Sequence, residues 1–329
     1  MPVTGVQPFL HPFRQFSTLL PKLPTAQALR ALQALQALPP LAPLASLLPH
    51  PRALPLPRLR LPSKVAGISV TFLKATALEL AILTGHLLLY PSGVTQERRV
   101  APVQPPPDAP RLPPDSRPPA LLLHGFIDNR SVFVLLRRAL AQHGGRHVES
   151  LNYSPLICDI RTAAELLGRH IEEICERTGH TRVDIVGHSL GGLIARYYAQ
   201  RLGGDVRVRT LVTLGTPHGG TRVAPLADAH PIVRQMRPGS EVIEELKEPA
   251  PDCRTHFVNF WSDLDQLMDP LETACIDHPD LTAQNVRVTG IGHLALPVHP
   301  AVANGIIQAL DLANPGAHAK GAPGGLTVA

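Results

Sequence analysis

One short motif places a hydroxyl nucleophile between small residues. It lies after the apolar stretch 183–186 and before the amphipathic stretch 190–201. A strand, a sharp turn and a helix in that order lift a serine hydroxyl above the edge of a sheet, and small neighbours let the strand and the helix approach each other. The sequence therefore predicts a nucleophile elbow with a reactive serine at its tip. The motif consists of Gly187, His188, Ser189, Leu190 and Gly191.

A serine at its ordinary pKa is a poor nucleophile, so a base must lie within hydrogen-bond reach and a third group must orient that base. His293 follows the last expected strand, 286–289, and is the predicted base. The expected strand 256–260 leads into Asp263 and Asp265, and of these two acids we favour Asp265 as the orienting carboxylate. Four other histidines lack a comparable position after a strand and are interpreted as structural: His188, His218, His278 and His299.

The negative charge that develops on an attacked carbonyl needs preorganised N–H donors. The backbone N–H of Leu190, directly after the serine, is one predicted donor. The second is the N–H of Phe126, in the loop after the expected strand 120–123, where His124 and Gly125 fit a close backbone approach. The alternative is that this loop is only a turn that ends the strand.

Short apolar runs alternate with amphipathic stretches in the second part of the chain, which is typical of strand–helix units around a mainly parallel sheet. We expect an α/β domain over 118–314, with helices flanking the sheet and a flexible tail at 315–329. The expected strands are 120–123, 148–151, 183–186, 208–214, 256–260 and 286–289. The expected helices are 131–142, 160–177, 190–201 and 301–312.

An insert at 221–252 interrupts this alternation and contains a helical stretch, 240–247. Its place in the chain suits a small lid or a wall of an acyl pocket. An ordinary cap that packs on the domain is the equal alternative. No acidic residues stand at calcium-ligand spacing, and we expect neither a metal nor another cofactor. The side chains of the insert that could face a substrate are Val223, Leu226, Ile232, Val233 and Met236.

The first third of the chain has a different composition. Of 36 prolines, 23 precede Leu121, and this part carries 12 Lys and Arg against 4 Asp and Glu. Proline fixes φ and removes a donor, so we expect a Pro/Leu-rich low-complexity segment at 1–63 and a proline-rich linker at the end of 64–117. No convincing signal peptide is found. The basic charge lies outside the α/β domain, which argues against nucleic-acid binding.

The stretch 65–90 has no proline and is mostly apolar, which predicts a helix long enough to cross a bilayer. It contains Lys74, Glu79 and His86, and charges at the middle of a bilayer are costly. There are three alternatives for this stretch. It is an interfacial or protein-packed helix, it is a membrane span, or it is neither of these. The basic segment before it suits an anionic membrane surface as well as it suits a solvated tail. We expect a membrane-associated or cytoplasmic location, with an extracellular location as the alternative.

The four cysteines are too few for a disulfide scaffold and form no CxxC pair. Cys158 and Cys175 would lie about 25 Å apart along one helix, which excludes a bond between them. A bond between Cys253 and Cys275 is one alternative. Four free thiols are the other.

Five motifs in one order resemble those of bacterial α/β-hydrolase lipases, in particular the actinobacterial triacylglycerol lipase and esterase group. The motifs, which span 121–302, are LLLHGFIDN, VDIVGHSLGGLIARYY, LVTLGTPHGGT, FWSDLDQLM and GIGHLALP. The resemblance implies the α/β-hydrolase fold, with Asp265 as the acid and His293 as the histidine of the site. It also implies oxyanion amides at Phe126 and Leu190. The N-terminal third lies outside this pattern and inherits nothing from it.

These observations predict a serine carboxylic ester hydrolase that forms an acyl-serine intermediate and takes a lipid or a small apolar ester. A membrane-associated acyltransferase or thioesterase is the first alternative, because it would use the same acyl-serine. A membrane-tethered binding protein with an idle site is the second. The joint presence of Ser189, Asp265 and His293 argues against an idle site.

Overall fold

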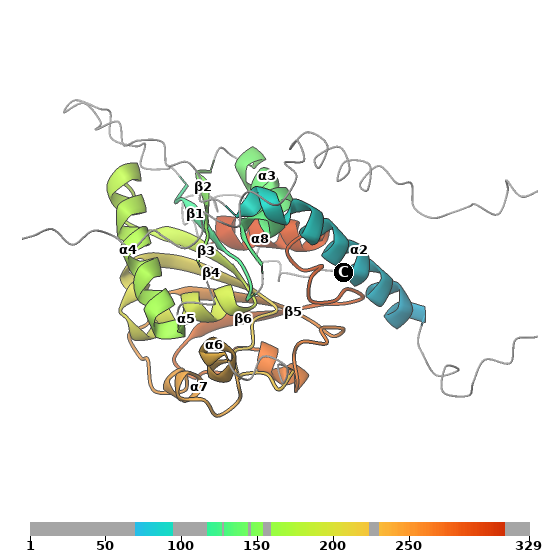
Figure 1. Ribbon diagram of the computed structural model, residues 1–329. Coiled ribbons are helices and arrows are strands. Elements are labelled where there is room, and N and C mark those ends of the chain that lie inside the picture. Colours follow the sequence, from blue (N-terminus) through green and yellow to red (C-terminus); the bar gives the residue numbers. More distant parts are fainter. Residues whose placement is uncertain are drawn as a thin grey trace, which may run out of the picture. The chain divides into compact units, whose positions relative to one another are not determined.

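A six-stranded sheet forms the centre of the computed structural model, and every pair of neighbouring strands is parallel (Figure 1). The strand order is β2-β1-β3-β4-β5-β6. The strands are β1 (Ala120–Leu123), β2 (Val148–Leu151), β3 (Val183–His188), β4 (Val208–Leu214), β5 (His256–Ser262) and β6 (Thr282–Val288). The structure describes residues 70–94, 117–126, 128–143, 146–153, 159–223 and 230–312, all in the unit Leu59–Ala329.

The predicted α/β architecture is confirmed, and three strands have the predicted bounds while β3, β5 and β6 differ. The largest difference is at β6, which begins at Thr282 rather than at residue 286. This strand lies at the edge of the sheet and pairs with β5 alone. Its first half is therefore free to be polar, and the apolar run that marks a buried strand is missing there.

Helices cover both faces of the sheet (Figure 1). Leu121 and Leu123 of β1 belong to the core shared with α4 and α5. Ala120 and Leu122, which point the opposite way, belong to the core shared with α3 and α8. The sheet is thus buried on both sides, as continuous apolar strands require. These helices are α3 (Val134–Gln142), α4 (Ile160–Thr178), α5 (Leu190–Arg201) and α8 (Pro300–Leu312).

The helix expected at 131–142 begins with a 3-10 turn, η3 (Arg130–Phe133). Asn129 caps this turn, because its side-chain oxygen accepts a hydrogen bond of 2.9 Å from the Ser131 N–H. The same Asn129 donates to the Tyr90 carbonyl at 2.9 Å. One side chain therefore fixes the start of this turn and joins it to a segment almost forty residues earlier.

The described part of the insert packs on the domain as a cap. It holds two short helices, α6 (Pro231–Gln235) and α7 (Glu241–Glu245). The side chains of Ile232, Val233 and Met236 are buried in the core shared with α4 and α5. Val223 is exposed, and Leu226 lies outside the described residues.

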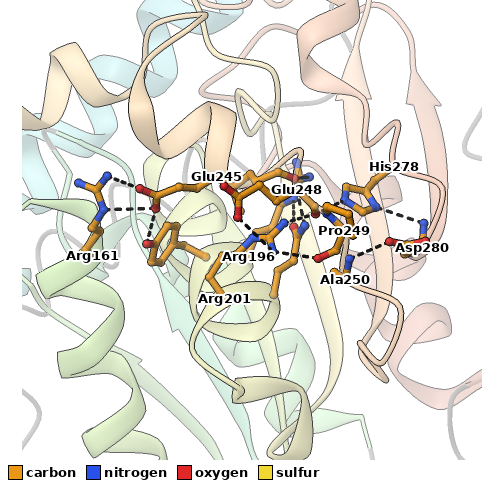
Figure 2. Close-up of polar contacts among 12 residues, drawn as sticks. Arg161, Arg196, Arg201, Glu245, Glu248, Pro249, Ala250, His278 and Asp280 are labelled. Carbon is orange, nitrogen blue, oxygen red and sulfur yellow. Dashed lines mark hydrogen bonds and ion pairs between the residues drawn. The ribbon is translucent and has the colours of Figure 1, made fainter.

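Buried polar contacts hold this cap against α5 (Figure 2). Arg196 donates to the Leu246 carbonyl at 3.0 Å and to the His218 carbonyl at 3.3 Å. Burial lowers the pKa of Arg196 to about 10, and the guanidinium stays charged at neutral pH. At the other side of the cap, Arg161 of α4 contacts Glu245 of α7.

One more helix, α2 (Val70–Gly93), packs against the α/β domain along a single stripe. The members of the stripe recur at intervals of three and four, which is the spacing of one helical face. By length and composition, α2 is the one helix among the described residues that is long and apolar enough to cross a membrane. Residues 65–69 of the expected helix lie outside the described part. The stripe comprises Ala75, Glu79, Ile82, His86, Leu89 and Gly93.

Three of the four cysteines are described, and all three are free thiols. Burial raises the pKa of Cys175, Cys253 and Cys275. The structure therefore favours free thiols over a bond between Cys253 and Cys275. Cys158 lies outside the described residues.

Candidate active site

Residues from four loops meet at one edge of the sheet. Because all strands are parallel, their carboxyl ends lie at the same edge. β3 leads directly into Ser189, β4 into Gly215 and β5 into Asp263. The loop after β6 carries His293. This is the edge at which open α/β sheets bind their ligands.

Ser189 has an unusual backbone, with φ 51° and ψ −120°. It is the one non-glycine residue with positive φ among those described. Such a conformation costs roughly 1–3 kcal/mol and persists where the surroundings enforce it. Here the Ser189 N–H donates to the Leu214 carbonyl at 2.9 Å, and α5 begins at the next residue.

Close approach of the strand and the helix explains the glycines of the motif. A Cβ added to Gly187 would lie 2.5 Å from the Cα of Gly192, and one added to Gly191 would lie 2.4 Å from the Leu123 carbonyl oxygen. Real side chains do not tolerate such distances. The elbow therefore needs glycine before and after the serine.

His293 and Asp265 form a buried hydrogen-bonded pair. The His293 Nδ1 lies 2.7 Å from the Asp265 Oδ2, and the Asp265 Oδ1 accepts a bond of 2.9 Å from the Leu267 N–H. Gly215 makes room for the pair, because a Cβ there would lie 2.9 Å from both paired atoms. The other acid considered, Asp263, binds Arg287 at 2.8 Å.

The charge around His293 favours its protonated form. Burial alone would lower the pKa of His293, but the Asp265 carboxylate, Glu79 and Asp128 together raise it by more. The pKa of His293 is therefore raised above its ordinary value. An imidazole in this setting takes up a proton readily, as a general base must.

His188 links the elbow to the loop that carries His293. Its Nε2 lies 3.3 Å from the His293 carbonyl oxygen, and the centres of the two rings are 4.7 Å apart. The structure thus brings the residue before Ser189 into contact with residue 293. The interpretation of His188 as structural is compatible with this linking position.

The loop after β1 runs beside the serine. A Cβ on Gly125 would lie 3.5 Å from the Cβ of Ser189, which places this backbone next to the nucleophile. The Phe126 ring packs edge-on against His230 at the start of α6, with 5.6 Å between ring centres. Leu190 is the first residue of α5, where backbone N–H groups have no partner within the helix. Both residues with predicted oxyanion amides therefore lie close to Ser189.

A cluster of buried histidines around Asp128 was not anticipated from the sequence. The Asp128 carboxylate lies 3.6 Å from His188 Nδ1 and 3.9 Å from His86 Nδ1. Burial would raise the pKa of Asp128, but His188, His86 and His124 together lower it. Burial lowers the pKa of His86 and of His124. One carboxylate therefore lies among three imidazoles beside the candidate site, and burial favours the neutral form of His86 and of His124.

Glu79 of α2 binds the loop that carries His293, and sequence reasoning missed this as well. Its two carboxylate oxygens accept bonds of 2.9 Å from the N–H groups of Leu294 and Ala295. A Cβ on Gly292 would lie 2.5 Å from the Glu79 carboxyl carbon, so a larger residue there would displace the Glu79 side chain. Glu79 thus binds the backbone that follows His293 and lies close to Gly292, which precedes it.

The other histidines that we interpreted as structural lie in different places. Burial holds the pKa of His218 well below its ordinary value, and its Nε2 pairs with the Thr213 hydroxyl at 3.0 Å. His278 pairs with the Glu248 carbonyl at 3.0 Å, and His299 is partly buried, so that its pKa is lowered. Within the described ranges, no cluster of three or more His, Cys, Asp or Glu side chains could hold a metal ion.

A surface cavity of about 640 Å³ is lined by Gln200, Asp205 and Cys253, among others. It lies at the end of α5 opposite to Ser189. This cavity is therefore separate from the candidate active site.

Comparison with known proteins identifies the fold. A profile of the alpha/beta hydrolase fold matches residues 118–246. Two solved structures share the fold. Aspergillus fumigatus lipase B has a TM-score of 0.54 and 16% identity, and the match covers 61% of this chain and 53% of that one. Bacillus licheniformis lipase BlEst2 has a TM-score of 0.51 and 17% identity, and the match covers 62% of this chain and 94% of that one. The chain has the α/β-hydrolase fold, with a six-stranded parallel sheet flanked by helices.

Two curated relatives are similar over a shorter region. Triacylglycerol lipase of Pseudarthrobacter phenanthrenivorans is 29% identical over 116 residues, which are 33% of this chain and 36% of that protein. Triacylglycerol lipase of Burkholderia plantarii is 29% identical over 116 residues, which are 33% of this chain and 32% of that protein. The chain therefore spans about a third of the length of these relatives.

Proposed function

We propose that this protein is a serine carboxylic ester hydrolase of the lipase or esterase type, with Ser189, Asp265 and His293 as its catalytic triad. The observation that carries the proposal is the positive φ of Ser189, at a turn between strand and helix, on the sheet edge that also holds the buried Asp265–His293 pair. Strain of this kind clusters at catalytic sites. The two lipases that match by sequence support the same class of reaction.

In this mechanism the Ser189 hydroxyl oxygen attacks the ester carbonyl carbon while His293 takes the hydroxyl proton. Asp265 binds the opposite ring nitrogen and stabilises the imidazolium that forms. The oxyanion receives hydrogen bonds from the N–H groups of Phe126 and Leu190. The alcohol leaves with the proton from His293, and water then cleaves the acyl-serine to release the acid.

An apolar ester with a lipid-like acyl chain is the proposed substrate. Phe126, next to Gly125 in the loop beside Ser189, packs against the apolar core of the domain and against His230 of the cap. Both curated relatives are named as triacylglycerol lipases. An acyl-serine could also be resolved by an alcohol or formed from a thioester, so transfer and thioester cleavage are the competing reactions.

A series of p-nitrophenyl esters tests this proposal on the full chain. We expect hydrolysis of acetate, butyrate and octanoate esters, with kcat/KM higher for octanoate than for acetate because a longer apolar chain buries more surface. Absence of hydrolysis in the whole series would refute the function. An acetate preference would exclude a lipase, and acyl transfer to added alcohol that outpaces hydrolysis would identify an acyltransferase.

Glu79 is predicted to position His293 without touching the substrate. In Glu79→Gln, one of the two N–H groups at Leu294 and Ala295 loses its acceptor and meets an amide donor instead. We expect kcat/KM to fall on the order of 10–100-fold, as for small displacements of catalytic groups. The charge of Glu79 also raises the pKa of His293, so the acid limb of the pH–rate profile should move to lower pH.

The matched control is Lys74→Gln, which removes an exposed charge from the same helix. It should leave both kcat/KM and the pH profile unchanged. If Glu79→Gln reduced activity without moving the acid limb, Glu79 would have only a structural role. If Glu79→Gln behaved like wild type, the contact with the His293 loop would be irrelevant to catalysis.

A further inference from the structure

The helix α2 has the reverse of the usual arrangement of polar and apolar side chains. Its packed stripe contains the charged Glu79, which binds the loop that carries His293, and the polar His86, which lies near Asp128. Its outward side is apolar: Leu80 is 60% exposed and Leu87 65% exposed. A helix in contact only with water would place these groups the other way round.

The exposed apolar face is long and continuous. Leu73, Leu80 and Leu87 recur every seven residues and therefore form one stripe along the outside of the helix. Within the described helix, Lys74 is the single exposed charge. Soluble proteins rarely leave such an area of apolar side chains in contact with water unless it binds something. The exposed large apolar side chains of α2 are Val70, Phe72, Leu73, Leu78, Leu80, Leu83, Leu87, Leu88 and Tyr90.

We propose that this outward face of α2 binds the surface of an anionic lipid bilayer, so that the helix lies in the interface and holds the active-site loops at the membrane. The sequence before α2 supplies the charge complementarity, because residues 1–69 contain seven Lys and Arg and no Asp or Glu. Basic residues near a membrane surface are attracted to anionic lipid.

The contacts of α2 argue for an interfacial helix and against a membrane span. In a span, lipid surrounds a helix unless other membrane-embedded segments cover it. Here one face is bound to the α/β domain through Glu79 and through Tyr90, whose carbonyl accepts a bond from Asn129. The contacts of Glu79 and Tyr90 hold two points of α2, eleven residues apart, against the domain. Only the outward face is then free to enter the lipid, to the shallow depth of an interfacial helix.

Vesicle binding of the full chain tests the proposal independently of hydrolysis. The probe is phosphatidylcholine vesicles that contain about 25% phosphatidylglycerol, the anionic lipid. We expect the wild type to sediment with these vesicles, and the double variant Leu80→Ser/Leu87→Ser to bind at least about tenfold more weakly, because two apolar side chains no longer enter the lipid. Binding should weaken when phosphatidylglycerol is left out.

The control variant is Leu166→Ser/Leu202→Ser, which changes two exposed leucines outside α2 and should bind vesicles like the wild type. Hydrolysis of soluble p-nitrophenyl acetate should be unchanged in both double variants, so that failure of the ester hydrolase proposal and failure of the membrane proposal are separate results. Wild-type protein that ignores the vesicles, or equal binding by Leu80→Ser/Leu87→Ser, would overturn the membrane contact. A dimer in solution that this variant converts to a monomer would instead assign the face to a second copy of the chain.

Discussion

Replacing Ser189 with alanine is expected to lower kcat for p-nitrophenyl ester hydrolysis by about 10⁶-fold, the loss seen when a triad nucleophile is removed. A fluorophosphonate probe should label the wild type at Ser189 and should not label the variant. The fold should persist, because alanine meets the same backbone strain at φ 51° that serine does. Circular dichroism and thermal unfolding check this.

The matched control is Ser150→Ala. Ser150 is buried in β2, and its hydroxyl has no hydrogen-bond partner among the described residues, so its loss should affect neither labelling nor rate. Ser189→Gly separates the geometry from the chemistry. It should be as inactive as Ser189→Ala yet have a Tm about 2–4 °C higher, because glycine tolerates positive φ. Retained hydrolysis in Ser189→Ala would end the triad assignment.

The elbow could be predicted from the sequence because it is a local structure. The apolar run of β3, the glycines and the helix that follows are contiguous, and the same glycines are the positions where a Cβ would collide. The sheet could be predicted for a similar reason, since its inner strands are buried on both faces and read as apolar runs. Where that burial ends, at the polar start of β6, prediction of the strand failed.

The contacts of α2 could not be predicted because they join residues far apart in the chain. Glu79 binds a loop more than two hundred residues later, and His86 lies near Asp128, which follows it in the chain by about forty residues. Apolar composition indicated a helix, and Glu79 and His86 are seven residues apart, which is the spacing of one helical face. Nothing in the sequence indicated that this polar face would pack against the domain, because the charged face of a surface helix normally points toward water.

Asp265→Asn is the substitution that best tests how the acid acts, and we expect it to lower kcat/KM by about 10⁴-fold. The Asp265 Oδ1 accepts the Leu267 N–H, and asparagine can keep this bond with its own oxygen. Its NH₂ group then faces His293 Nδ1, which must become the acceptor. The ring proton then moves to His293 Nε2, the nitrogen that takes the serine proton in the proposed mechanism, and the imidazole can no longer act as that base.

The pH dependence of kcat/KM in the wild type and in Asp265→Asn gives a second expected result, and the direction of its change follows from the charge of Asp265. Catalysis needs neutral His293, so kcat/KM should rise with pH through a pKa above the ordinary histidine value of about 6.5, because Asp265 raises it. Without that carboxylate the pKa falls, and the residual activity of Asp265→Asn should reach its plateau at lower pH. Asp263→Asn, which alters the neighbouring acid paired with Arg287, should keep the wild-type rate and profile. If instead Asp263→Asn lost activity and Asp265→Asn did not, the acid of the triad would be Asp263.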